Sequence, residues 1–88
     1  MKNLFLNEKK ALVMMNLLSG ADYIRHIAES SNTMYPHALQ TLKLLEKKGY
    51  VNSAKEGRIR MYQLTEEGEK VASLIQELWE LTQNQEVK

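Results

Sequence analysis

The fold follows from one stretch of the sequence, Asn32-Thr33-Met34-Tyr35-Pro36-His37-Ala38-Leu39-Gln40-Thr41-Leu42-Lys43-Leu44-Leu45-Glu46-Lys47-Lys48-Gly49. Thr33 is a suitable N-cap for a helix, because its hydroxyl can accept a hydrogen bond from the unpaired N–H groups of the first turn. Pro36 falls in that turn, where a missing N–H costs little. Two lysines and then Gly49 supply the stop, since cations suit the negative helix end and glycine adopts left-handed backbone. The stretch predicts a helix from about residue 34 to about residue 48.

The two faces of this predicted helix differ in chemistry. Steps of three and four residues place apolar side chains on one face, which must be buried: Ala38, Leu42 and Leu45, flanked by Met34, Tyr35 and Leu39. The opposite face carries groups that hydrogen-bond base edges and phosphates: Thr33, Pro36, His37, Gln40, Lys43 and Lys47. For this helix taken alone, an ordinary amphipathic helix with a solvated polar face explains the pattern equally well.

The composition is that of one small globular domain over residues 1–88, with 43% hydrophobic and 26% charged residues. Its apolar runs are too short to span a bilayer, and we recognise no signal peptide at its start. The absence of cysteine excludes disulfides, thiolate catalysis and thiolate metal sites. We therefore expect a cytoplasmic protein with no membrane partner.

The charge distribution is more informative than the net charge of +1. Residues 33–62 contain six basic and two acidic side chains, a balance of +4. Residues 63–88 contain two lysines and six glutamates, a balance of −4. Such polarity suits a molecule that meets an anionic partner on one side.

Before the central helix, the pattern predicts two further helices. Asn7 can cap the first, from about 8 to 19, and Leu6 is placed to pack on it as a hydrophobic staple. Its apolar face would contain Ala11, Leu12, Met14, Met15 and Leu18. Ala21-Asp22-Tyr23 is either a short strand or the capped entry to a second helix, which buries Ile24, Ile27 and Ala28. The turn 30–32 then joins two short helices into a helix-turn-helix.

After Gly49, the sequence predicts a β-hairpin with a basic tip. Its strands are 50–54 and 59–64, and Gly57 can supply the positive φ that a hairpin turn demands. Alternation along the second strand puts Arg58, Arg60, Tyr62 and Leu64 on one face, the last two reaching the core. The arginines then project where the hairpin extends beyond the core.

The last helix, over 65–83, opens with Thr65 as cap and two glutamates at its positive end. Its apolar positions are too many for one small domain to cover: Val71, Leu74, Ile75, Leu78, Trp79 and Leu81. We therefore expect a homodimer interface there, with the alternative that the helix folds back over the first helix of its own chain. Residues 84–88 are expected to fray.

This order of elements resembles the winged helix-turn-helix domain of bacterial and archaeal transcriptional regulators of the MarR, ArsR and PadR kind. The resemblance covers residues 8–75 and is carried by two runs, Leu42-x-x-Leu45-Glu46-Lys47-Lys48-Gly49-Tyr50-Val51 and Tyr62-Gln63-Leu64-Thr65-Glu66-Glu67-Gly68. It implies a mainly α fold with a small β-hairpin (α+β), whose winged core spans 8–64. It also implies a homodimer that binds specific double-stranded DNA, with one helix in the major groove and the wing on the backbone or minor groove.

Carried over residue by residue, the resemblance makes 33–48 the recognition helix and 54–60 the wing. Recognition-helix contacts to DNA would come from Thr33, Tyr35, Pro36, His37, Gln40, Thr41, Lys43 and Lys47. Wing contacts would come from Lys55, Arg58 and Arg60. This agrees with the chemistry, because phosphate neutralisation supplies affinity and an amide such as Gln40 can pair bidentately with adenine.

Departures from the family pattern narrow the expectations. MarR proteins build a ligand pocket from helices at both ends, whereas one helix follows the wing here, so the sequence gives little support for a small-molecule effector and leaves a ligand, a partner or protein abundance as means of regulation. His26 and His37 stand alone, so we expect no metal site of the ArsR kind and no cofactor. No phosphate loop or paired carboxylate points to an enzyme. The remaining alternative is a winged helix used for protein–protein contact in a larger complex, which predicts a neutral or apolar recognition face.

Overall fold

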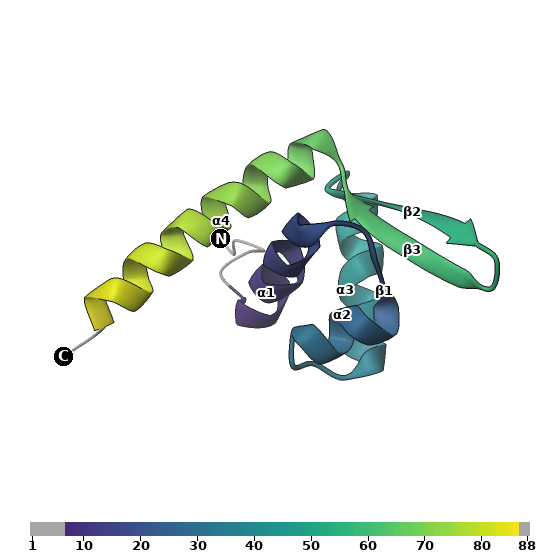
Figure 1. Cartoon of the computed structure of the whole chain (residues 1–88), viewed down its shortest axis with the longest axis horizontal. Coiled ribbons are helices and arrows are strands. Elements are labelled where there is room, and N and C mark those ends of the chain that lie inside the picture. The colour runs from purple at the N-terminus through teal and green to yellow at the C-terminus, as the bar shows by residue number, and fades with distance from the viewer. Residues whose placement is uncertain (1–6, 87–88) are drawn as a thin grey trace.

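The computed structural model describes residues 7–86, with side-chain positions for 7–82. The elements follow in the order α1 (Glu8–Asn16), a 3₁₀ turn (Leu17–Ser19), β1 (Asp22–Tyr23), α2 (Ile24–Ser30), α3 (Tyr35–Lys47), β2 (Val51–Glu56), β3 (Ile59–Leu64) and α4 (Glu66–Glu86) (Figure 1). This is the expected order of a winged helix-turn-helix, with the wing formed by β2 and β3. Helix α4 continues past residue 83, and residues 87–88 lie outside the described chain.

The three strands form one antiparallel sheet in the order β1-β3-β2. The hairpin register pairs Val51 with Leu64 and Glu56 with Ile59, so the turn between them contains two residues. Gly57, in that turn, has a φ of 65°, as the sequence predicted. β1 settles the ambiguity before α2, because Asp22 and Tyr23 pair with β3 as a short strand.

One core joins the helices to the sheet. It contains residues of α1, α2, α3, the hairpin and α4: Val13, Met14, Leu17, Ile27, Leu42, Leu45, Val51, Tyr62 and Ala72. Figure 1 shows α1 between α4 and the α2–α3 pair, while α4 and the wing extend away from each other. The long axis of the molecule measures 47 Å, against 26 and 24 Å for the other two.

The start of α1 is as predicted, but its buried face is not. Asn7 caps the helix by accepting from the N–H groups of Lys9 and Lys10, while the staple by Leu6 lies outside the described residues. Val13 and Leu17 are buried together with Ala11 and Met14, whereas the leucine at 12 and its stripe partners Met15 and Leu18 are only partly buried. Ala11 and Met14 of the predicted stripe are therefore confirmed, but the buried face continues through Val13 and Leu17 rather than through residues 12, 15 and 18.

The beginning of α3 corrects two predictions. The N-cap is Met34, not Thr33, and it makes no side-chain cap bond; the N–H of Thr33 instead donates to the carbonyl of Ala28 in the preceding turn. Met34 and Tyr35 are 68% and 51% exposed, so neither belongs to the buried stripe. The rest of that stripe, Ala38, Leu42 and Leu45, is buried as expected.

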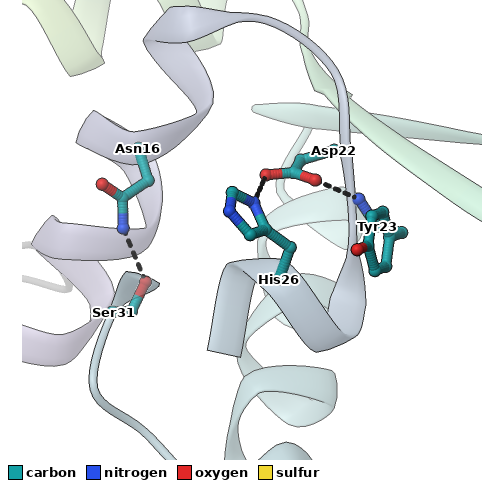
Figure 2. Close-up of polar contacts among 5 residues, drawn as sticks. All are labelled: Asn16, Asp22, Tyr23, His26 and Ser31. Atoms are coloured by element: carbon teal, nitrogen blue, oxygen red, sulfur yellow. Dashed lines mark hydrogen bonds and ion pairs between the residues drawn. The ribbon is translucent and has the colours of Figure 1, made fainter. Parts of the chain in front are cut away.

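The turn between α2 and α3 is held from α1. Ser31 is fully buried, and its Oγ accepts from the side-chain amide of Asn16 at 3.0 Å (Figure 2). Asn32 adopts a left-handed φ of 53°, and its carbonyl accepts from the ammonium of Lys9. These bonds fix the direction in which the chain enters α3.

The start of α4 is tied to the end of α3. Thr65 accepts from the N–H of Gly68 at 3.0 Å and donates its hydroxyl to the carbonyl of Gly49 at 2.7 Å. The N–H of Thr65 also donates to the carbonyl of Tyr50 at 3.0 Å. A Cβ added at Gly68 would lie 2.0 Å from that carbonyl oxygen, so this close approach requires glycine. The cap predicted at Thr65 is confirmed.

Candidate nucleic-acid interface

The recognition helix predicted from the sequence presents most of its assigned side chains to solvent. Six are exposed: Tyr35, Pro36, His37, Gln40, Lys43 and Lys47. Thr33 and Thr41 are partly buried and lie at the edges of this surface. Because Ala38, Leu42 and Leu45 hold the opposite face in the core, α3 offers a fixed polar ridge.

The wing places two cations directly opposite each other. The hairpin register pairs Lys55 with Arg60, and alternation puts both on the face that carries Tyr62 and Leu64 toward the core. Like charges at directly opposed positions destabilise a sheet. A hairpin that keeps them there has a local electrostatic cost that an anionic partner would offset, and Arg58, in the turn, is exposed beside them.

A chain of hydrogen bonds joins the wing to α3. The guanidinium Nη1 of Arg60 donates to the hydroxyl of Ser53 at 3.0 Å, and that hydroxyl donates to a carboxylate oxygen of Glu46 at 2.8 Å. The three side chains come from β3, β2 and α3. Arg60 therefore lies on the α3 side of the wing, and four guanidinium N–H donors remain beyond this bond.

The sequence reading missed Glu46 and Ser53. Both could have been found from the two-residue turn, because that turn fixes the register and makes Ser53 a diagonal neighbour of Arg60 on the inner face. Glu46 lies in the last turn of α3, just before Gly49 and β2, and this short connection keeps it near Ser53.

The pKa of Tyr62 reflects the charges where the wing meets α3. Burial raises the pKa of its phenol above the ordinary value of 10.0. The positive charge of Arg60 lowers that pKa, whereas the negative charge of Glu46 and the phenol of Tyr35 raise it. Charged or titratable groups at both ends of α3 and on β3 thus influence the pKa of this one phenol.

The two histidines lie in different settings. His37 is exposed on α3. His26 pairs through Nδ1 with the carboxylate of Asp22, whose other oxygen accepts from the N–H of Tyr23 (Figure 2). The bond to Asp22 raises the pKa of His26 above its ordinary value of 6.5. The N-cap of α2 is Tyr23, which makes no side-chain cap bond, so the alternative that Asp22 caps this helix was wrong. Among residues 7–86, no three His, Cys, Asp or Glu side chains gather where they could hold a metal ion.

Helix α4 has a different character. Leu74, Leu78 and Leu81, on one side of the helix, are 65%, 57% and 59% exposed. The other residues assigned to a dimer interface, Val71, Ile75 and Trp79, are partly buried, and Val71 and Ile75 pack against the chain's own core. Helix α4 thus packs against α1 with one side and exposes an apolar stripe on another. No helix within residues 7–86 has the length and apolar character needed to cross a membrane.

Comparison with known proteins agrees with this geometry. A family model described as HxlR-like helix-turn-helix matches residues 6–88. A protein of Archaeoglobus fulgidus described as uncharacterized is 29% identical over 86 residues, which covers 92% of this chain and 90% of the relative.

Two solved structures show the same fold at low sequence identity. An apo-form mutant of ZitR from Lactococcus lactis has a TM-score of 0.83 at 22% identity, and a MarR family transcriptional regulator from Silicibacter pomeroyi has 0.80 at 18%. The alignment with ZitR covers 91% of this chain and 63% of the longer ZitR chain. The alignment with the Silicibacter pomeroyi regulator covers 90% of this chain and 58% of that longer chain. The chain therefore belongs to the HxlR-like helix-turn-helix family.

Proposed function

We propose that the protein binds specific double-stranded DNA as a homodimer, with α3 in the major groove and the wing on the backbone or in the minor groove, and that it does so in the cytoplasm. One observation carries the proposal. The bonds from Glu46 through Ser53 to Arg60 hold the cationic wing beside the polar face of α3. An anionic surface long enough to meet both elements fits this arrangement.

The exposed side of α3 would supply base readout. Gln40 sits in the middle of the helix on its outermost side, and its amide can both donate to and accept from the edge of adenine. Tyr35, Pro36 and His37 lie at the leading end, which enters the groove first in such proteins. Lys43 and Lys47, one turn apart, would meet phosphates of the groove wall. Thr33 and Thr41 would contact the edges of the site.

The wing would supply sequence-independent affinity. Lys55 and Arg60 face each other across the hairpin, so one phosphate between them would relieve their mutual repulsion. Arg58, at the tip, reaches farthest from the core and is the candidate for the minor groove. Each neutralised phosphate releases counterions, which makes the affinity fall as salt rises.

The dimer would form through α4. Its 21 residues correspond to about 31 Å of helix, and the exposed leucine stripe runs along the part that extends past the core. A second copy covering Leu74, Leu78 and Leu81 would remove these side chains from water. Two copies of α3 would then meet half-sites one helical turn, about 10 bp, apart on a near-palindromic operator.

Binding of the purified protein to DNA from upstream of its own gene, at two salt concentrations, tests the proposal. The protein's mass in solution is measured alongside. We expect a dimer, binding that weakens steeply with salt, and a weaker salt dependence in the Lys55→Ala/Arg60→Ala variant.

Lys70→Ala is the matched control, because it removes the same kind of charge from α4. Equal effects of the control and the wing variant, or salt-independent binding, would contradict the proposed interface. Tight binding to a protein partner with no affinity for DNA would support the protein–protein alternative.

A further inference from the structure

Two large apolar side chains lie exposed at the leading end of the proposed DNA surface. Met34 is 68% exposed, the highest value among the exposed large hydrophobic residues of the described chain, and Tyr35 beside it is 51% exposed. The apolar stripe on α4 accounts for three of the others through the proposed dimer. No part of the chain that the structure describes covers Met34, so its side chain and that of Tyr35 form an apolar pair open to a partner.

The local backbone makes the position of Met34 more telling. It is the N-cap of α3, with extended φ and ψ of −78° and 149°, and it makes no capping bond. Serine, threonine, aspartate and asparagine are the residues that stabilise this position. A methionine here gives up that stabilisation, and such departures from a local rule are typical of functional positions.

The neighbours of Met34 define what it would meet. On the same leading part of α3, Pro36, His37 and Gln40 are exposed, and Lys43 follows one turn later. An apolar side chain at the end of a surface of hydrogen-bonding and cationic groups matches the major-groove edge of A·T pairs, because thymine is the one base that presents a methyl group there.

We propose that Met34, with Tyr35 beside it, contacts thymine 5-methyl groups in the major groove and thereby favours thymine at the start of each half-site. This rests on the proposed DNA-binding function. The thioether side chain is flexible and polarisable, so it can follow a methyl group whose position shifts slightly with DNA shape.

Replacing thymine by deoxyuridine removes only the methyl group and therefore tests the contact directly. The purified protein first selects a binding site from a pool of duplexes with a random central region. Each thymine of that site is then replaced by deoxyuridine, one at a time. We expect about a fourfold loss of affinity per contacted methyl at one or two positions in each half-site.

Variants connect that loss to the side chain. In Met34→Ala the deoxyuridine penalty should disappear at the same positions, while Met34→Leu, which keeps an apolar side chain, should retain it. Ile59→Ala is the matched control, because it removes an exposed apolar side chain from the wing, 49% exposed, and should leave the penalty unchanged.

The outcomes separate this inference from the function on which it rests. Selection of a site that tolerates deoxyuridine at every position, or that contains no thymine, would overturn the methyl contact and leave DNA binding intact. A penalty that persists in Met34→Ala would also overturn it. Failure to enrich any sequence would overturn both proposals.

Discussion

The α3–wing surface and helix α4 differ in both charge and rigidity of attachment. The first gathers lysines and arginines; Leu42 and Leu45 anchor α3 in the core, and the Ser53 bonds join the wing to α3. The second carries glutamates and an exposed leucine stripe, and its later turns extend away from the core (Figure 1). The difference indicates a division of labour, in which one surface meets an anion and the other an apolar partner.

The largest effect we expect comes from charging the α4 stripe. Leu78→Glu would place a carboxylate among apolar side chains of the second copy, so the protein should become monomeric. Affinity for a two-half-site duplex should fall by about a hundredfold, while affinity for a single half-site stays the same. Sedimentation and titration of both duplexes measure this.

Gln76→Glu is the control for that change, because it adds the same charge on a different side of α4. If both variants remain dimeric with unchanged affinity, the leucine stripe is not the interface.

The next largest effect concerns the contact that joins the start of α4 to the end of α3. Gly68→Ala would drive a Cβ into the carbonyl of Tyr50, 2.0 Å away, so the start of α4 must shift. We expect a loss of about 1–3 kcal/mol in the free energy of unfolding, measured by urea denaturation. Ser73→Ala, at an exposed position of the same helix, should change it by less than about 0.5 kcal/mol. A Gly68→Ala protein as stable as the wild type would show that the start of α4 does not pack closely against the carbonyl of Tyr50.

A third prediction divides the α3–wing surface itself. Arg58→Ala should reduce the salt slope of binding by about one and weaken all sequences alike. Gln40→Ala should leave that slope unchanged and lower discrimination at one base pair by about 1–3 kcal/mol. Titrations of the selected site and its single-base variants at several salt concentrations distinguish the two. Identical behaviour of both variants would remove the distinction between readout and affinity.

The smallest expected effect is a pH dependence outside both regions. Because Asp22 raises the pKa of His26, the pair stabilises the folded protein fully below the ordinary pKa of 6.5, and this stabilisation is lost as pH rises through the higher folded pKa. The denaturation midpoint should therefore decrease slightly from pH 6 to alkaline pH. Asp22→Asn should flatten that slope; an unchanged slope would exclude His26 as its source.

Much of the fold could be predicted because its signals are local. The cap at Asn7, the left-handed Gly49 and the hairpin turn at Gly57 each depend on a few neighbouring residues. The N-cap of α3 was mispredicted because the end of α2 uses Thr33: its N–H closes the preceding turn onto the carbonyl of Ala28, which leaves Met34 at the helix start.

The exposed residues of the candidate site were predicted from the sequence, but the hydrogen bonds and cross-strand pairs among its side chains were not. Periodicity identified the exposed Gln40 and Lys43 because their face is opposite the buried stripe. Periodicity alone did not reveal the bond from Ser53 to Glu46, or Lys55 facing Arg60, because these also depend on the strand register that the two-residue turn sets. The exposure of Met34 was missed for a different reason, because a helical pattern treats every methionine on the apolar side as core.

The central claim, that α3 and the wing form the DNA-binding surface whereas α4 forms the dimer surface, is tested most directly by NMR titration of the labelled protein with its selected duplex. We expect the signals of His37, Gln40 and Arg58 to shift together at the same DNA ratio, with those of the exposed α4 side, such as Lys70 and Ser73, unchanged. Shifts concentrated on α4, or on α3 without the wing, would contradict the claim.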